Sequence, residues 1–289
     1  MKHLKKWLAL TLAAVLVMGM LPSLPHAQAE EIPEAEQDIR AEQPQPEEPA
    51  AEEPAAEESE PESGTWTWVN PALPEDMVPN AQIPSAEPMG IPNAEPQEEQ
   101  KPVKEEKAAE ELRKMLRNRS GPIYLEVYSD IREPYEFMDH LVNLATEPTG
   151  DPHDGDYLRW SIGQIGFSYI LNYWGYEIMI DATYLLTEDQ EAEMDGAISR
   201  AVRNLDVSSN SNYEKIFAVY DYLCDKVAYL EPSEENEVVS YTAYGALMNK
   251  EATSHGFAVL ANRMLLELGV DNRVVGGAVG EYEHLWNVV

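Results

Sequence analysis

Hydrophobic and polar positions recur along residues 104–289 in patterns that predict both helices and strands. Apolar residues three and four positions apart favour helices, and short runs of β-branched, aromatic and alternating residues favour strands. We expect helices over residues 108–119, 134–144, 188–205, 212–227, 242–249 and 254–268, and strands over residues 122–129, 272–279 and onward from 284. Two longer β-type runs, 157–173 and 176–186, flank the turn at Trp174 and Gly175 and predict a hairpin. The pattern predicts an α+β fold.

The first 29 residues have the pattern of a signal peptide for export. Three lysines within the first six residues precede an apolar run from Trp7 to about Leu21, and Ala27-Gln28-Ala29 supplies a small-residue cleavage site. The apolar run is shorter than the ~20 residues that cross a bilayer, so a cleaved signal is favoured over a membrane anchor. We therefore expect a secreted or cell-envelope protein that begins at Glu30 and has no membrane span after cleavage.

Residues 30–103 lack a folding pattern over most of their length. The segment is rich in Glu, Pro, Ala and Gln, and such a composition predicts a disordered, extended linker. Trp66-Thr67-Trp68-Val69 interrupts it with a small aromatic island. Three interpretations of the island remain open: a docking motif, a strand that folds back on the domain, or an isolated cluster in the linker.

The charge of the chain restricts its partners. The sequence holds 53 Asp and Glu against 20 Lys and Arg, a formal net charge of −33. This excess excludes a simple nucleic-acid binder and disfavours docking on anionic lipid through a basic patch. More than half of the excess negative charge falls in the linker. The charge therefore indicates a soluble, extended linker rather than a property of the folded part.

The sequence predicts neither a metal nor a cofactor. Its one cysteine, Cys224, excludes an intramolecular disulfide framework, and we expect it to be a small buried residue rather than a nucleophile. The six histidines are scattered without metal-ligand spacing, and no glycine-rich phosphate loop occurs. Three carboxylates in the loop Asp151–Asp156 offer a calcium alternative, but their spacing differs from a calcium-binding loop and a solvated turn is favoured.

The last eighty residues carry a series of motifs in a specific order. The motifs are Tyr241-Thr242-Ala243-Tyr244-Gly245-Ala246-Leu247, Gly256-Phe257-Ala258, Leu268-Gly269-Val270, Arg273-Val274-Val275-Gly276-Gly277 and His284-Leu285-Trp286-Asn287-Val288-Val289. The series resembles the transglutaminase-like domain of secreted bacterial proteins, in the papain-like cysteine-enzyme superfamily. The resemblance implies a core in which a helix packs on an antiparallel sheet. We therefore expect an N-terminal α+β subdomain with the hairpin at 104–209 and a transglutaminase-like core at 210–289.

The resemblance also implies the positions of a catalytic site. In that family a cysteine nucleophile opens the central helix, and here Ser254 occupies its position. His284 matches the family histidine. The third catalytic residue of the family is an Asp on a following strand, beyond Val289, so the resemblance implies a truncated core and an incomplete site. Asn287 and Glu283 are the candidates that remain to orient His284.

The chemistry of serine favours a degenerate site. A serine hydroxyl needs a base that accepts its proton and a partner that orients the base, whereas serine is also among the best N-cap residues. We therefore expect Ser254 to cap the helix. His255 is a poor base for Ser254, because adjacent helical residues point ~100° apart. Tyr244, Trp286 and Tyr282 are candidates to line a groove. Packing in the core is the alternative, and it is favoured for Trp286.

Three functions follow from these observations. The first hypothesis is a secreted, non-catalytic transglutaminase-like protein that binds a polypeptide or a cell-envelope component. The second is an active acyl-transfer enzyme, of the peptidase or protein-glutamine transferase type, that uses Ser254 with His284. The third is a structural exported module on an acidic stalk. The sequence does not predict an oligomeric state.

Overall fold

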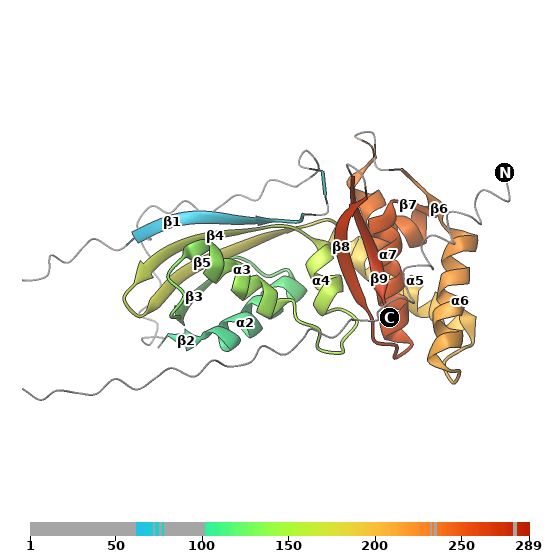
Figure 1. Cartoon of the computed structure of the whole chain (residues 1–289), viewed down its shortest axis with the longest axis horizontal. Helices are drawn as coiled ribbons and strands as arrows, with labels where there is room; N and C mark the ends of the chain where they lie inside the picture. Colours follow the sequence, from blue (N-terminus) through green and yellow to red (C-terminus); the bar gives the residue numbers. More distant parts are fainter. Residues whose placement is uncertain are drawn as a thin grey trace, which may run out of the picture. The chain divides into compact units, whose positions relative to one another are not determined.

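We describe the fold from a computed structural model of the chain (Figure 1). The structure describes residues 62–71, 73–74, 77, 102–231, 233, 236–279 and 282–289. The predicted signal peptide and most of the predicted linker lie outside these residues. The described part contains both helices and strands, which confirms the α+β prediction. None of its helices is both long and apolar enough to cross a membrane.

The first half of the described chain builds a five-stranded sheet. Its strands are β1 (Glu62–Val69), β2 (Val103–Lys104), β3 (Ile123–Tyr128), β4 (Ile162–Asn172) and β5 (Gly175–Tyr184). They lie in the order β1-β4-β5-β3-β2, with all neighbours antiparallel except β2 and β3. Helices α2 (Glu105–Asn118) and α3 (Pro134–Ala145) pack with the sheet around one hydrophobic cluster that includes Leu112, Phe137 and Ile180 (Figure 1). The helices and the hairpin predicted for this region are therefore confirmed.

One part of the predicted hairpin is wrong. Residues from Tyr157 onward were expected to be strand, but Gly155–Ser161 form helix α4 and β4 begins at Ile162. A short apolar run does not distinguish a buried strand from a buried helical turn by its periodicity. Here Leu158 joins the cluster beneath the sheet, and Tyr157 joins a second cluster on the other side of α4. A helical turn places these two neighbouring side chains in different cores.

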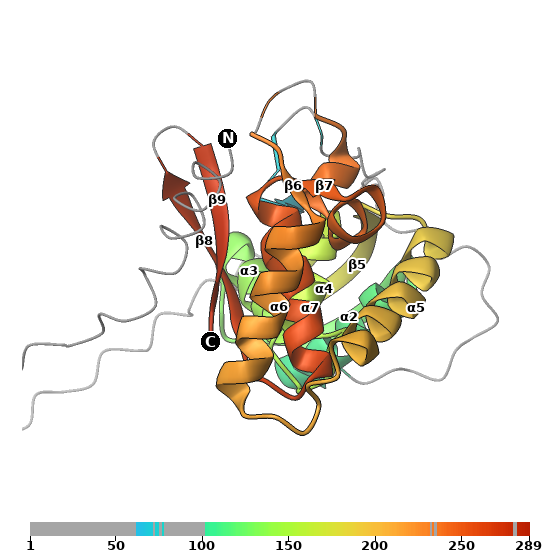
Figure 2. The ribbon, with the colours of Figure 1, turned by 90° about the vertical axis from the view of Figure 1, so that its right-hand side faces the viewer.

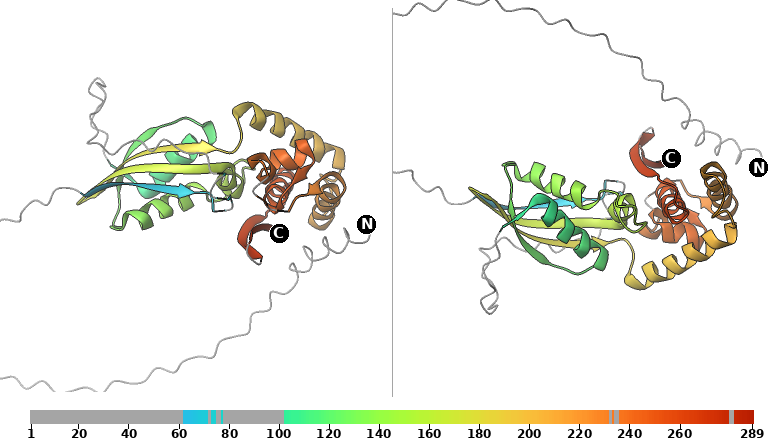
Figure 3. Two further views of the ribbon diagram at one scale, coloured as in Figure 1. Left: turned by 90° about the horizontal axis from the view of Figure 1, so that it is seen from above. Right: turned by 90° about the horizontal axis from the view of Figure 1, so that it is seen from below.

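The linker prediction is wrong for residues 62–69. These residues form β1, which pairs antiparallel with β4 from Glu62 opposite Leu171 to Val69 opposite Gln164 (Figure 3). Trp68 is buried, and the ring of Trp66 lies 5.4 Å from that of Phe167. The period of two in a strand directs both tryptophans to the same face. Of the three interpretations of the aromatic island, the structure shows the strand that folds back on the domain.

The second half of the described chain surrounds a separate hydrophobic cluster. Its elements are α5 (Glu188–Leu205), α6 (Asn212–Lys226), β6 (Ala228–Tyr229), a 3-10 helix η3 (Val238–Tyr241), a π-helix η4 (Gly245–Asn249), β7 (Glu251–Ala252), α7 (Ser254–Glu267), β8 (Arg273–Val279) and β9 (Tyr282–Val288). Figure 2 shows the β8–β9 hairpin on one side of α7 and α5 on the other, with α6 in front of α7. The buried Met194 and Ile198 of α5 belong to this second cluster, although the predicted boundary at 209/210 assigned them to the preceding subdomain.

The ends of the helices are fixed by local signals. Thr187 caps α5 with a reciprocal capping box that involves Gln190, and Ser211 caps α6 in the same way with Glu214. Gly269 ends α7 with a φ of 72°, a conformation that glycine adopts without strain. The N–H of Val270 then donates to the Leu265 carbonyl at 2.9 Å. This turn directs the chain into the hairpin that packs on α7.

Candidate functional site

The N-terminus of α7 carries the residue that matches the family nucleophile, Ser254. Thr253 is the N-cap residue and Ser254 is the first residue inside the helix, so the predicted capping role of Ser254 is wrong. Thr253 takes the cap position because its N–H donates to the Ser240 carbonyl at 3.0 Å, outside the helix. The Ser254 side chain is 4 % exposed, and its Oγ atom has no hydrogen-bond partner among the described residues.

Close packing holds this end of the helix in place. A Cβ atom at Gly256 would lie 2.7 Å from the Thr242 carbonyl oxygen and 2.7 Å from the Ala252 Cβ. Neither atom is the far end of a flexible side chain. The glycine of the Gly256-Phe257-Ala258 motif therefore has a packing reason: it lets the first turn of α7 approach the backbone of the preceding segment.

His255 is buried without hydrogen bonds. It is 3 % exposed, and within the described chain neither ring nitrogen has a hydrogen-bond partner. Its ring centroid lies 5.3 Å from that of Tyr241. Burial, with a smaller contribution from the charge of His284, lowers the pKa of His255 to about 4. The imidazole is therefore neutral near pH 7, and its nitrogens do not contact Ser254 Oγ.

His284 lies on β9, as the strand pattern predicted. It is half-buried, and its ring lies 6.2 Å from that of Trp286 on the same face of the strand. Burial lowers the pKa of His284, and the charge of Glu231 acts in the opposite direction. Since His284 contributes to the lowered pKa of His255, the two imidazoles lie within electrostatic range at the start of α7. They do so without a hydrogen bond from His284 to Ser254 Oγ.

The residues proposed to orient His284 have other surroundings. Asn287 donates to the Ala258 carbonyl at 2.9 Å and to Asn272 Oδ1 at 3.3 Å, so it fastens the hairpin to α7. Glu283 is exposed. The carboxylate that acts on His284 is Glu231, which follows β6 and lies far from His284 in sequence. No sequence signal marks this pair, because only the fold brings the two segments together.

Two of the aromatic residues expected to line a groove, Tyr244 and Trp286, make other contacts. Tyr244 donates to Glu193 on α5 at 2.9 Å. Trp286 lies over Gly277, where an added Cβ atom would approach its ring to 2.8 Å. The side chain of Tyr282 lies outside the described part. Trp286 therefore packs on its own hairpin and does not join the hydrophobic clusters of the described chain.

A small, closed pocket with no room for a water molecule lies instead beside the start of α7. Its lining residues come from the segments after β1 and β5 and from α4, η3, α7 and β9. They are Asn70, Leu73, Trp160, Leu185, Tyr241, His255, Val259 and Leu285. The lining is largely apolar and carries no charged side chain. Trp160 Nε1 is buried there with no acceptor within the described residues. The pocket thus contains two groups that can form hydrogen bonds, Trp160 and His255, in apolar surroundings.

The acidic loop at 151–156 is occupied by ion pairs rather than available to a cation. Asp156 accepts from Arg273 Nε at 2.8 Å and Nη2 at 3.0 Å. Arg117 lies 3.1 Å from Asp151 and 3.2 Å from Asp154. The described residues contain no group of three or more side chains that could hold a metal ion. Arg117 and Arg273 thus neutralise the carboxylates that suggested a calcium-binding loop.

Cys224 is exposed on α6, so the expectation of a buried residue is wrong. The helix directs Val219 and Leu223 into the core, and the position after Leu223 is rotated ~100° away from them. Partial burial nevertheless raises the pKa of the Cys224 thiol. It lacks the low pKa of a reactive thiolate.

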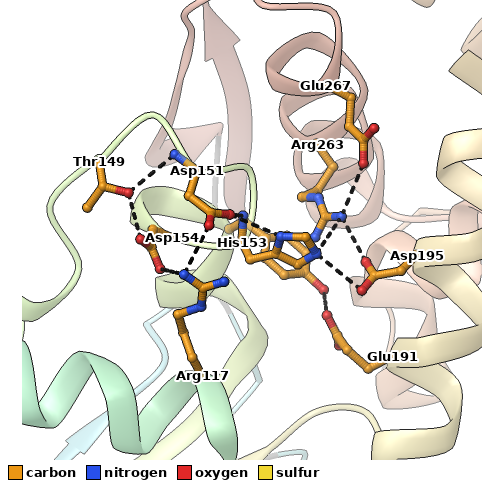
Figure 4. A network of polar contacts seen from close by, with 10 residues as sticks. Arg117, Thr149, Asp151, His153, Asp154, Glu191, Asp195, Arg263 and Glu267 are labelled. Atoms are coloured by element: carbon orange, nitrogen blue, oxygen red, sulfur yellow. Dashed lines mark hydrogen bonds and ion pairs between the residues drawn. The ribbon is translucent and has the colours of Figure 1, made fainter.

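A buried arginine links α7 to α5 and to the acidic loop (Figure 4). Arg263 is fully buried, and its Nη2 lies 2.8 Å from Asp195 on α5 and 3.2 Å from His153 Nε2. His153 also lies 3.0 Å from Asp151. Hydrogen bonding to Asp195 raises the pKa of His153. The sequence did not reveal this network, because its members come from three separate segments.

A family model matches the last part of the chain, which contains α7. Residues 199–289 match the model of the transglutaminase-like superfamily. The chain carries a transglutaminase-like domain. No curated protein matches the chain. The transglutaminase-like domain begins within α5 and includes α6, α7 and the β8–β9 hairpin, so it contains both Ser254 and His284.

Proposed function

We propose that this chain is an exported protein whose transglutaminase-like domain is non-catalytic and binds a polypeptide. The observation that carries the proposal is the environment of Ser254. A serine hydroxyl becomes a nucleophile when a base accepts its proton through a hydrogen bond. The Ser254 hydroxyl is buried, and none of the described residues forms that hydrogen bond. Within the described chain, no base contacts the oxygen through a hydrogen bond.

The C-terminal hairpin supports binding of an extended polypeptide. In the described part of the chain β8 and β9 pair only with each other, so each keeps one edge without ladder hydrogen bonds. Such an edge offers backbone N–H and C=O groups to an added strand. Tyr229, 44 % exposed, lies near Phe257 with ring centroids 6.0 Å apart and adds an aromatic surface close to the start of α7. Backbone pairing with aromatic contacts suits a polypeptide better than a small ion.

Activity assays of the exported form separate the proposal from an acyl-transfer enzyme. Ser254→Ala and Ser254→Cys are compared with the natural protein for hydrolysis of a casein substrate and for incorporation of a fluorescent amine. We expect no turnover by the natural protein or by Ser254→Ala. Turnover by the natural protein that is lost in Ser254→Ala would contradict the proposal and establish Ser254 as a nucleophile. Turnover in Ser254→Cys alone would show preserved geometry around a degenerate position.

Binding is tested separately from turnover. A fluorescent decapeptide library and purified peptidoglycan serve as probes for the natural protein, with Tyr229→Ala as the variant. We expect selective peptide binding that weakens about tenfold in Tyr229→Ala. Binding of peptidoglycan alone would favour a cell-envelope ligand, and binding of neither probe would favour a structural module. Export itself predicts a secreted form whose N-terminal sequence begins at Glu30.

A further inference from the structure

The chain that leaves β1 lies beside the start of α7, in the transglutaminase-like domain. We call its described residues Asn70, Pro71, Leu73, Pro74 and Met77 the strap. The Asn70 N–H donates to the Gly163 carbonyl at 3.0 Å, and its side chain donates to the Ile162 carbonyl at 2.8 Å. These two bonds fix the strap to the beginning of β4, next to the pocket at the start of α7.

Leu73 is the side chain with which the strap closes this pocket. It is 8 % exposed and clusters with Leu185 and Tyr241, and Met77 and Val238 pack against the same cluster. Leu73 and His255 both line the pocket. The strap therefore covers the pocket with an aliphatic side chain and leaves His255 without access to water.

The closed strap leaves several polar atoms without partners at one place. Trp160 Nε1, Ser254 Oγ and both ring nitrogens of His255 are buried, and the described chain supplies no hydrogen-bond partner to any of them. Most buried polar groups in native proteins are paired, and an unpaired one costs free energy relative to its hydrated state. Closing the strap thus buries Leu73 favourably and dehydrates the polar atoms of Trp160 and His255, which line the pocket, unfavourably. The two opposing effects favour a strap that opens readily.

We propose that the strap is an intramolecular plug, and that the pocket beneath it accepts an aliphatic side chain of the bound polypeptide in the place of Leu73. The inference rests on the proposed function, in which this domain binds a polypeptide. An aliphatic side chain fits because Leu185, Val259 and Leu285 form the apolar wall. A charged side chain does not fit, because no charged residue lines the pocket to compensate its loss of water. The backbone of a ligand would supply partners for Trp160 and His255.

Opening of the strap is tested by hydrogen exchange of the exported form, without any ligand. The rate of hydrogen exchange at the backbone amides of residues 253–260 is compared between the natural protein, Leu73→Ala and Leu73→Met. We expect about tenfold faster exchange in Leu73→Ala, and natural exchange in Leu73→Met, which keeps an aliphatic side chain. Val69→Ala is the matched control, since Val69 is exposed and does not line the pocket. Unchanged exchange in Leu73→Ala, with a native circular dichroism spectrum, would overturn the plug.

The nature of the pocket is tested with a peptide added in trans. The probe is a synthetic nonapeptide with the sequence of residues 69–77, and its control carries Asp in place of Leu73. We expect the first peptide to restore slow exchange at 253–260 in Leu73→Ala and the control to have no effect. Fast exchange in Leu73→Ala that neither peptide slows, or that both slow equally, would overturn the aliphatic pocket. A strap peptide that binds while no library peptide does would contradict the proposed function and leave the plug intact.

Discussion

At the scale of single residues, burial without hydrogen bonds distinguishes the Ser254–His255 pair. His255 is the neutral, dehydrated histidine at the start of α7, and its pKa is lowered to about 4 chiefly by burial. In the unfolded chain the same side chain titrates near its ordinary value of about 6.5. Below that value the unfolded state binds a proton that the folded state does not, so acid destabilises the fold through His255.

This difference predicts an acid-dependent loss of stability. Since each tenfold change in proton affinity corresponds to ~1.4 kcal/mol, the contribution of His255 falls by about 3 kcal/mol as the pH decreases from 6.5 to 4. Urea unfolding of the natural protein and of His255→Gln at pH 6.5 and pH 4 measures this change in the free energy of unfolding. We expect the free energy of unfolding to depend less on pH in His255→Gln than in the natural protein. His140→Gln is the control, because His140 is a partly exposed histidine paired with Glu105. An equal pH effect in the natural protein and in both variants would show that His255 does not cause the loss.

At the scale of elements, the Arg263 network holds α7 against α5. Arg263 is fully buried, whereas its partner Asp195 is 36 % exposed at the side chain. The Arg263 guanidinium also lies over the ring of Tyr157 at 4.4 Å, and Tyr157 donates a hydrogen bond to Glu191 on α5. The network thus combines an ion pair, a cation–π contact and a hydrogen bond across three helices.

Removal of the arginine is expected to destabilise the fold more than removal of its partner. Arg263→Ala leaves a cavity and separates Asp195 from its charge partner, and we expect a loss of about 3–5 kcal/mol in the free energy of unfolding. Asp195→Asn is expected to cost less, because Asp195 remains in contact with water. Chemical denaturation measures both. Arg200→Ala, an exposed arginine on α5, should change stability by less than ~0.5 kcal/mol. A loss in Arg263→Ala as small as that in Arg200→Ala would contradict the structural role.

The elements were predictable where periodicity and caps agree. The helices at α5 and α6 follow from apolar stripes that begin after Thr187 and Ser211, and the hairpin follows from the turn at Trp174 and Gly175. The helix at Gly155–Ser161 was not predictable, because Tyr157, Leu158 and Trp160 are residues that fit a strand as well as a helical turn. The effects of Glu231 on the pKa of His284 and of His153 on the pKa of Asp195 were not predictable either. No local sequence signal indicates contacts between distant segments.

At the scale of the whole molecule, the folded part begins earlier in the chain than its composition indicates. The aromatic island was detectable as an interruption of the linker, but its pairing with β4 was not, because strand partners are chosen by tertiary packing. Residues 62–69 complete the five-stranded sheet and place Trp66 and Trp68 against its hydrophobic cluster. The segment therefore belongs to the fold although it is surrounded by linker sequence.

Truncation tests this assignment. A chain that begins at residue 70 lacks β1, exposes the ladder edge of β4 and uncovers the cluster that Trp68 closes. We expect a lower melting temperature and concentration-dependent aggregation, measured by calorimetry and light scattering. A chain that begins at residue 58 keeps β1 and serves as the control. Equal melting temperatures for the two chains would show that β1 contributes nothing to stability.

The pairing of β1 with β4 has a consequence during synthesis. Glu62 pairs with Leu171, so the ribosome adds more than a hundred further residues before the partner strand exists. Such non-local contacts form late, and an apolar strand without its partner is prone to aggregate. Glu57, Glu58, Glu60 and Glu62 lie within the ten residues before Trp66, where charged residues act as gatekeepers against self-association. The acidic, proline-rich flank thus keeps a nascent strand soluble until β4 arrives.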